Sequence, residues 1–185
     1  MWEPDEIAVV IGYSQKAVNE VNLVNCANDK VPVLKRRGGG GAVVLMPGIL
    51  CITMAFLSDK SISPYYFFKE INLFIIRQLK SHFNILSLEC KGISDIAIDN
   101  KKILGCSIFK SRNMFFYQGS LLVNPDMSKI DQYLLHPTKE PDYRNGRKHQ
   151  DFLTCLQCCG YEIGLEEIQG ILDESITREL RKAIT

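Results

Sequence analysis

The 185-residue chain carries 22 lysine and arginine residues against 21 aspartate and glutamate residues, a formal net charge of +1, and 46% of its residues are hydrophobic. This balance is typical of a soluble protein with one core, and it excludes a general electrostatic attraction to nucleic acid or to an anionic membrane. No apolar run approaches the roughly 18 residues that a membrane-spanning helix requires. The acidic segment 2–6 lacks the pattern of a signal peptide, so we expect a cytoplasmic protein.

A short strand and then a helix are predicted at the start of the chain. Residues 7–11 form an apolar run, which indicates a buried strand. Ser14 can cap the helix that follows, and this helix would place Val18, Val21 and Val24 on one face.

The most unusual stretch is Lys35-Arg36-Arg37 followed by four glycines, residues 38–41, between apolar runs at 31–34 and 43–44 that predict strands. Glycine has no Cβ, so the backbone can approach a ligand closely and its N–H groups can converge on an anion, while the adjacent cations supply positive charge. The pattern GxxxxGK[ST] is absent, so this is not a P-loop. We predict an anion-binding loop, and the alternative is a flexible glycine loop.

A central strand and a long helix are predicted next. Residues 49–57 are rich in β-branched and large apolar side chains, as a central strand would be. Ser63 at the cap and Pro64 at the first helical position predict the start of the helix. Its apolar stripe must cover one face of a sheet and consists of Phe67, Ile71, Phe74, Ile75 and Leu79.

The second half of the chain predicts an antiparallel meander, because short polar connectors of hairpin length join four apolar segments. These strands are expected at residues 86–89, 93–98, 103–110 and 114–123. A short helix over 128–135 with Asp126 as its cap and a polar loop over 136–148 follow. The chain is expected to end in an amphipathic helix with apolar residues at Ile168, Ile171, Leu172, Ile176, Leu180 and Ile184.

Seven cysteines are scattered along the chain, mostly among apolar residues. An odd number at irregular spacing favours reduced, buried thiols over a disulfide framework. A zinc site at Cys155-x-x-Cys158-Cys159 with His149 is the alternative, but a second ligand pair at suitable spacing is lacking. We therefore interpret these cysteines as core residues and expect no metal site.

Three segments in order make the chain recognisable: 92–98 (Gly-Ile-Ser-Asp-Ile-Ala-Ile), 101–107 (Lys-Lys-Ile-Leu-Gly-Cys-Ser) and 117–124 (Tyr-Gln-Gly-Ser-Leu-Leu-Val-Asn). With the glycine loop, they resemble the lipoate-protein ligase family, which has a two-arginine glycine loop, a strand with an acidic residue, a Lys-x-x-Gly-Ser/Cys segment and a Gly-Thr/Ser-Leu-Leu strand in this order. The resemblance begins at residues 2–15, with a strand-Gly-x-x-Gln segment, and covers nearly the whole chain.

The resemblance implies the α+β fold shared by the catalytic domains of biotin and lipoate ligases, a mixed, largely antiparallel sheet covered by helices. It implies that residues 1–185 form a single catalytic domain that begins at the family's second strand, without the first strand and helix and without the accessory C-terminal domain of some ligases. Biotin ligation is not favoured, because the Gly-Arg-Gly-Arg loop of biotin ligases differs from this one.

The implied reaction is the attack of the lipoate carboxylate on the α-phosphate of ATP, with Mg²⁺ as activator, to give lipoyl-adenylate and pyrophosphate. A lysine of a lipoyl carrier domain then takes the acyl group as an amide. The implied carriers are the lipoyl domains of 2-oxoacid dehydrogenases or the glycine cleavage H protein, and neither nucleic acid nor a membrane is an expected partner.

By this resemblance Lys102 is the catalytic residue, a fixed cation that screens the repulsion between a carboxylate and a phosphate. Without the surrounding motif, a solvated hairpin lysine beside Lys101 would be the better interpretation. Arg36 is expected to contact the adenylate and Arg37 either to join it or to face solvent, while Asp95 would hold the nucleotide or orient Lys102. The other expected ligand-binding positions are Gly39, Gly40, Gly41, Ala42, Val43, Val44, Gly105, Ser107 and Gly119.

The sequence departs from the family at two places. Where the family has Phe-His-Asp or Tyr-His-Asp after the glycine loop, this chain has Val44-Leu45-Met46, and Tyr117 stands where the family often has histidine. These departures favour an alternative: a partial or degenerate member that binds the lipoyl group or a carrier domain without full activity, completed by a separate accessory polypeptide.

A second alternative is a cysteine-dependent octanoyl or lipoyl transferase. Such an enzyme forms a thioester and requires an accessible thiolate close to the lysine. Cys90 and Cys106 are the candidates by position, although neither has a context that matches the family.

Overall fold

The strands of the chain pair into two sheets in the computed structural model, which describes residues 1–58 and 63–184, with side chains described up to Ile176. The larger sheet is antiparallel with the strand order β4-β8-β7-β6-β5, and the smaller sheet has the order β2-β1-β3. In the smaller sheet, β1 is parallel to β2 and antiparallel to β3. The strands are β1 (Ala8–Ile11), β2 (Val33–Lys35), β3 (Val43–Leu45), β4 (Ile49–Leu57), β5 (Leu88–Lys91), β6 (Asp95–Ile98), β7 (Lys101–Ser111) and β8 (Met114–Leu122).

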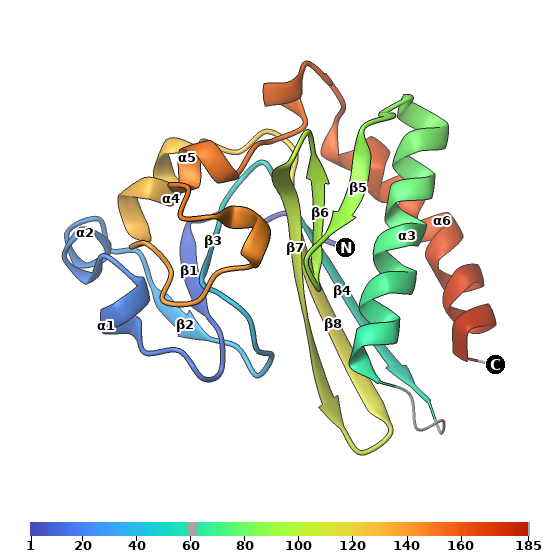
Figure 1. Cartoon of the computed structure of the whole chain (residues 1–185), viewed down its shortest axis with the longest axis horizontal. Helices are drawn as coiled ribbons and strands as arrows, with labels where there is room; N and C mark the ends of the chain where they lie inside the picture. The colour runs from blue at the N-terminus through green and yellow to red at the C-terminus, as the bar shows by residue number, and fades with distance from the viewer. Residues whose placement is uncertain (59–62, 185) are drawn as a thin grey trace.

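The two longest described helices cover one face of the larger sheet, and the smaller sheet with the short helices lies on the side of its other face (Figure 1). The helices are α1 (Ala17–Glu20), α2 (Leu23–Asn28), α3 (Pro64–Phe83), α4 (Ser128–Tyr133), α5 (His149–Phe152) and α6 (Leu165–Ile184), with the 3-10 turns η1 (Asp142–Arg144) and η2 (Gln157–Cys159). The predicted α+β fold and the antiparallel meander over β5 to β8 are therefore confirmed, although the strands are divided between two sheets.

Helix α3 begins and packs as the sequence predicts. The Ser63 hydroxyl accepts a hydrogen bond from the backbone N–H of Tyr65 at 3.2 Å, and Pro64 occupies the first turn. Its apolar stripe is buried against the larger sheet, where the Phe67 ring lies 4.8 Å from that of Phe56 and 4.6 Å from that of Phe115. The same core includes Ile168, Leu172 and Ile176 of α6, whereas Leu180 and Ile184 lie outside the described side chains.

The single helix predicted after Ser14 is wrong, because the chain forms two short helices with an extended residue, Val21, between them. Backbone pairing with the segment 133–135 imposes this break: the N–H of Asn22 donates to the carbonyl of Tyr133, and the N–H of Leu135 donates to that of Glu20. The three valines that were predicted to form one apolar helix face therefore do not lie on a common buried face. Val21 is buried, whereas Val18 is 66% exposed and Val24 is 69% exposed.

Strand β4 is an edge strand rather than the predicted central one. Apolar composition misled the prediction, because both faces of β4 are buried at its start, where residues 49–52 contribute to the cores of both sheets. The N-terminal segment covers part of this edge, since Trp2 and Cys51 exchange backbone hydrogen bonds at 3.1 and 2.9 Å.

One pair of cysteines also departs from expectation. Cys155 and Cys158 form a disulfide with their Cα atoms 5.0 Å apart, so the prediction of seven reduced thiols is wrong for this pair. The physical reason is local, because the chain turns helically from Leu156 into η2 and brings residues three apart to the same side. Cys26 and Cys51 are free and buried as expected.

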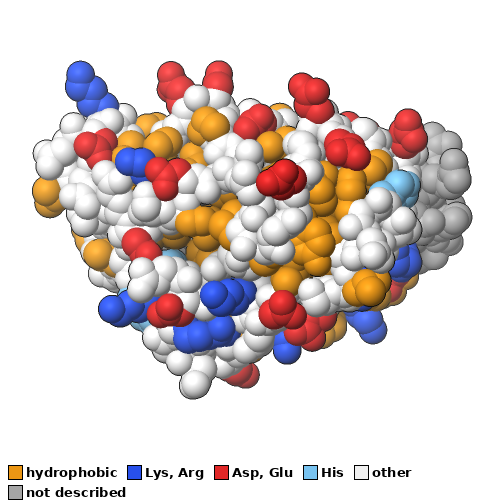
Figure 2. All heavy atoms as spheres, turned by 90° about the horizontal axis from the view of Figure 1, so that it is seen from above, with side chains coloured by type: hydrophobic (Ala, Val, Ile, Leu, Met, Phe, Trp, Pro, Cys, Tyr) orange, Lys and Arg blue, Asp and Glu red, His pale blue; other side chains and the backbone are white. Residues whose placement is uncertain are grey.

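The surface carries hydrophobic, acidic and basic side chains. Figure 2 shows a face on which hydrophobic side chains gather near the centre, with acidic groups around them and cations mainly along one border. Within residues 1–58 and 63–184, no helix combines the length and apolarity needed to cross a membrane.

Replacing Phe67 by alanine tests the α3 core. Because the ring is fully buried between two other phenylalanines, its loss should lower the free energy of unfolding by about 3–5 kcal/mol, measured by urea denaturation. Tyr65→Ala, at an exposed position of the same helix, should change it by less than about 1 kcal/mol. Equal losses in the two variants would contradict the packing described here.

Candidate active site

The glycine loop and strand β7 bring the two sheets together. A Cβ atom built on Gly38 would lie 2.8 Å from the Ser107 hydroxyl oxygen, so the loop of the smaller sheet is in direct contact with the larger sheet. Ser107 is buried by this contact. Two of the predicted ligand-binding segments, far apart in the sequence, therefore lie side by side.

Residues that follow β1 contact the glycine loop and hold its backbone in place. The N–H of Gly12 donates to the side-chain oxygen of Gln15 at 2.8 Å, and the N–H of Tyr13 donates to the carbonyl of Gly38 at 3.0 Å. A Cβ on Gly12 would lie 2.2 Å from the carbonyl oxygen of Gly40, so only glycine fits there. The Gly-x-x-Gln pattern thus serves to hold the glycine loop.

Arg36 points into the loop instead of away from it. Its guanidinium donates to the carbonyl oxygen of Gly39 at 2.7 and 3.2 Å, to that of Gly41 at 2.7 Å and to that of Val10 at 3.3 Å. Burial lowers the pKa of this guanidinium. The carbonyls of Gly39 and Gly41 turn towards Arg36, so the N–H groups of the same peptide units, which belong to Gly40 and Ala42, point away from it. Among the described residues, the N–H groups of Gly39, Gly40 and Gly41 have no hydrogen-bond acceptor. This geometry suits an anion.

The predicted ligand-binding residues on either side of the glycines differ in their exposure. Arg37 is exposed, with its guanidinium carbon 6.0 Å from the centre of the Phe109 ring. Ala42 and Val43 are half-buried, while Val44 is buried and pairs with Val9 in the smaller sheet. The two residues at which the chain departs from its family pattern pack into the same core: Leu45 is half-buried and Met46 is buried.

Lys102 lies on β7 and forms an ion pair with Asp95 on β6, with 3.0 Å between Nζ and Oδ1. The Lys102 side chain is 25% exposed and that of Asp95 only 6%. A Cβ on Gly105 would lie 2.5 Å from Cε and Nζ of Lys102, so the glycine leaves room for the lysine side chain to lie along the sheet. The structure therefore brings together Lys102, Asp95 and Gly105, three of the residues that the sequence analysis assigns to the site.

A β-bulge makes this grouping possible. Ile96 pairs with Leu104 and Ala97 pairs with Lys102, so Ile103 is an extra residue in β7. Side chains alternate between the faces of a strand, and residues 102 and 105 would point to opposite faces in a regular strand. The extra residue places both on the same face. On its other side, the carbonyl of Lys102 accepts a hydrogen bond from the N–H of Thr154 at 3.0 Å.

Tyr143 completes the group and was missed by the sequence analysis. Its hydroxyl donates to Oδ2 of Asp95 at 2.9 Å, so each carboxylate oxygen has a partner. Burial, followed by the charge of Asp95, raises the pKa of Tyr143. A tyrosine in a polar loop gives no sequence signal for this contact, because the partner lies 48 residues away.

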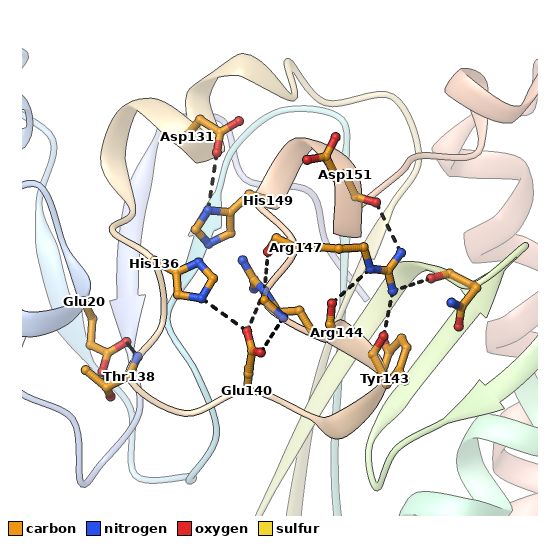
Figure 3. Close-up of polar contacts among 12 residues, drawn as sticks. Glu20, Asp131, His136, Thr138, Glu140, Tyr143, Arg144, Arg147, His149 and Asp151 are labelled. Atoms are coloured by element: carbon orange, nitrogen blue, oxygen red, sulfur yellow. Dashed lines mark hydrogen bonds and ion pairs between the residues drawn. The ribbon is translucent and has the colours of Figure 1, made fainter.

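The polar residues of the loop 136–149 stabilise the loop itself (Figure 3). Arg147 donates to the backbone oxygens of Tyr143 at 2.8 Å, of Arg144 at 3.0 Å and of Asn100 at 3.0 Å, and it thus links the loop to the β6–β7 turn. The Arg144 guanidinium is buried over the ring of Phe152 and pairs with Glu140 at 3.3 Å. The described contacts of these two arginines thus lie within the loop, with Phe152 and with the β6–β7 turn, while Nη2 of Arg144 is buried without a hydrogen-bond partner among the described residues.

A second buried pair lies beside them. His149 Nδ1 is 3.3 Å from a carboxylate oxygen of Asp131, which links α5 to α4. Burial, followed by the charge of Arg144, lowers the pKa of His149. Among the described residues, no group of three or more His, Cys, Asp or Glu side chains is arranged to hold a metal ion.

Gly119, another of the predicted site residues, lies on the face of the larger sheet opposite to Lys102. It is paired with Cys106, which follows Gly105 and faces the α3 side of the sheet. A Cβ on Gly119 would lie 2.9 Å from the Tyr117 hydroxyl, so the glycine makes room for that ring. Tyr117 is fully buried and donates to Asn72 of α3 at 3.3 Å.

The comparison with known families is decisive at this point, because residues 1–177 match the profile of the lipoyl protein ligase A/B catalytic domain. The chain belongs to this family. A relative, lipoate–protein ligase 1 of Plasmodium falciparum (isolate 3D7), is 33% identical over 134 residues, which are 72% of this chain and 31% of the relative. The chain spans between 31% and 40% of the length of four such curated ligases.

Solved structures of lipoate ligases share the fold. A bi-partite lipoate protein ligase of Thermoplasma acidophilum, studied with its E2 lipoyl domain, superposes with a TM-score of 0.81 at 21% identity and covers 95% of this chain and 68% of that one. A lipoate-protein ligase A bound with ATP superposes with a TM-score of 0.78 at 21% identity and covers 95% of this chain and 70% of that one. The two-sheet architecture is thus the family's architecture.

Gly12→Ala tests how the lipoyl ligase glycine loop is supported. Because the new methyl group would meet the Gly40 carbonyl, the loop must move, and the amide of Tyr13, which donates to the Gly38 carbonyl, should exchange with deuterium at least about tenfold faster. Gly39→Ala is the matched control, since a Cβ there meets no atom within 4 Å. The described support is wrong if exchange is unchanged in Gly12→Ala, as followed by mass spectrometry.

Proposed function

We propose that residues 1–185 form a single catalytic domain that joins lipoate to a lysine of a lipoyl carrier domain in two steps, through lipoyl-adenylate. One observation carries the proposal: Lys102, held by Asp95, lies on the strand that meets the glycine loop of the other sheet, in a chain of the lipoyl ligase family. A cation and a row of free N–H groups thus lie on two rigid supports that touch each other.

In the first step, a lipoate carboxylate oxygen attacks the α-phosphorus of ATP. The new P–O bond forms as the bond to the bridging oxygen breaks, and the electron pair leaves with pyrophosphate. Lys102 would stabilise the negative charge that gathers where carboxylate and phosphate approach, and the N–H groups of residues 39–41 would bind phosphate oxygens. Mg²⁺, when bound, neutralises triphosphate charge, with phosphate oxygens and water as its main ligands.

In the second step, the neutral amine of the carrier lysine attacks the acyl carbon of the adenylate. The bond between this carbon and the phosphate oxygen breaks, AMP leaves with the electron pair, and the new amide nitrogen loses a proton to solvent. Lys102 would assist again, because its charge stabilises the departing phosphate. No proton needs to leave Lys102 in either step.

The acyl chain would lie against the apolar side of the loop. Ala42 and Val43 are half-buried beside the free N–H groups, so they can contact an apolar chain whose carboxylate meets Lys102. Arg36 would act indirectly, since its guanidinium is occupied by loop carbonyls and orients the N–H groups that meet the anion. Arg37 is exposed and is free to meet the outer phosphates of ATP.

The proposed partners are lipoyl domains of 2-oxoacid dehydrogenases or the glycine cleavage H protein, in the cytoplasm. One observation supports a further polypeptide as well, because a structural neighbour is described as a bi-partite lipoate protein ligase. A separate accessory chain would then take part in one of the two steps.

Lys102→Ala tests the reaction. We expect adenylate formation from lipoate, ATP and Mg²⁺, measured as pyrophosphate release, to fall at least about 100-fold, equivalent to about 3 kcal/mol of lost transition-state stabilisation. Lys101→Ala is the matched control, because its side chain is exposed next in the chain, and it should keep activity within about twofold.

The mass of an apo lipoyl domain, followed in the same mixtures, separates the alternatives. A gain of one lipoyl group that depends on Lys102 supports the full reaction. A gain only from supplied lipoyl-adenylate indicates a domain that performs the second step. Carrier binding without any mass gain would refute the enzyme proposal and support a binding protein.

The geometry does not favour a cysteine-dependent transfer. Cys106 and Cys90 lie on the α3 side of the sheet, opposite to Lys102, and burial raises the pKa of Cys106 to about 12 and also that of Cys90. With such a pKa, the Cys106 thiol is scarcely ionised near neutral pH and is a poor nucleophile, while Cys90 is exposed but lies on the face opposite to Lys102.

The double variant Cys90→Ser with Cys106→Ala should therefore keep carrier modification within about threefold of the parent protein, measured as the initial rate of mass gain. A buried thiol can contribute to stability, so the melting temperature is measured alongside. If the double variant folds and loses activity with both lipoate and octanoate, a thioester route is correct instead.

A further inference from the structure

We propose that Tyr143 is a positioning residue for Lys102 and acts through Asp95. Neither the sequence pattern nor the lysine itself points to this residue, which lies in the 3-10 turn η1 of the loop 136–149. The inference rests on the proposed function for its catalytic consequence, but its structural part can be tested without any activity.

The geometry gives the two oxygens of Asp95 different partners. Oδ1 lies 3.0 Å from the Lys102 ammonium and accepts a long hydrogen bond of 3.5 Å from the Ser94 hydroxyl, and Oδ2 accepts the Tyr143 hydroxyl at 2.9 Å. Asp95 is only 5% exposed, so water cannot replace a lost donor easily. With a donor on each oxygen, the carboxylate has a single orientation, and Lys102 meets one oxygen from one direction.

The Tyr143 hydroxyl is itself fixed by the loop. Its ring packs against Phe152 with 5.0 Å between centroids, and on another side it borders the turn at Gly92. Its backbone oxygen accepts a hydrogen bond from Arg147 at 2.8 Å, and the same guanidinium binds the backbone of Asn100. The fold of the whole loop therefore determines where the hydroxyl lies relative to Asp95.

The phenol is suited to this role because it stays a donor. Burial and the neighbouring carboxylate raise the pKa of Tyr143, so the hydroxyl keeps its proton throughout the neutral range. Without it, Asp95 could rotate and offer both oxygens to Lys102. The ammonium would then be held more tightly against the sheet and would be less available to a phosphate.

The main test compares Tyr143→Phe with Tyr133→Phe. Both variants remove a hydroxyl that donates to an aspartate at 2.9 Å, but the acceptor of Tyr133 is Asp29, which directly follows helix α2 and is not part of the candidate site. For adenylate formation, Tyr143→Phe should lower kcat about tenfold and leave the KM values for ATP and lipoate within about twofold. Tyr133→Phe should leave all three parameters within about twofold.

A double-variant cycle shows whether Tyr143 acts through Asp95. In an Asp95→Ala background, the additional effect of Tyr143→Phe on single-turnover adenylate formation should be less than about twofold. An additional tenfold loss in this background would overturn the proposal, because Tyr143 would then act independently of the carboxylate.

A third measurement does not require a functioning ligase. The protein is treated with an amine-reactive acylating reagent. The rate of acylation of Lys102 is measured by mass spectrometry and compared with that of the neighbouring Lys101, which serves as an internal reference. Tyr143→Phe should slow the relative labelling of Lys102 at least threefold, and Tyr133→Phe should not change it. Unchanged labelling in Tyr143→Phe overturns the positioning role, whereas slowed labelling in a protein without adenylate formation refutes only the proposed function.

Discussion

The candidate site depends on one buried carboxylate. A charged group removed from water is stabilised only if donors meet it, and Asp95 obtains one donor from strand β7 and one from the loop 136–149. The ion pair with Lys102 also requires the bulge at Ile103 and the space above Gly105. The β6–β7 hairpin and the loop 136–149, which is distant in the sequence, must therefore fold together before the lysine has a defined direction.

In the glycine loop, the other part of the candidate site, backbone N–H groups rather than a side chain are the donors available to a ligand. In the glycine loop the charged side chain is turned inwards, because Arg36 binds backbone carbonyl oxygens, and the backbone itself presents the donors. Such donors are fixed by the chain and need no reorganisation when an anion arrives. Contact between Gly38 and Ser107 sets this loop against the strand that carries Lys102, and Asp95 holds the ammonium group of that lysine.

The structure shows what the residues that depart from the family pattern do in this protein. Leu45 and Met46 pack into the core of the smaller sheet, so the segment after the glycine loop contributes apolar contacts and no acid or base. In the proposed reaction, Lys102 and the loop N–H groups would still stabilise the developing negative charge. Tyr117, the other departure, lies on the α3 side of the sheet and contributes to packing with Asn72.

Local chemistry in the sequence determined the α+β elements, the α3 cap, the hairpins and the grouping of Lys102 with Asp95, because periodicity, capping residues and a linked motif act over short distances or by family pattern. It failed where a distant partner decided the outcome. Pairing with residues 133–135 broke the first helix, an extra residue set the direction of Lys102, and Gly119 fell on the opposite face. Tyr143 reaches Asp95 from 48 residues away. Only tertiary structure decides such contacts, since no local propensity encodes them. The glycine loop stands out in the sequence by its composition, but the inward direction of Arg36 required the folded chain.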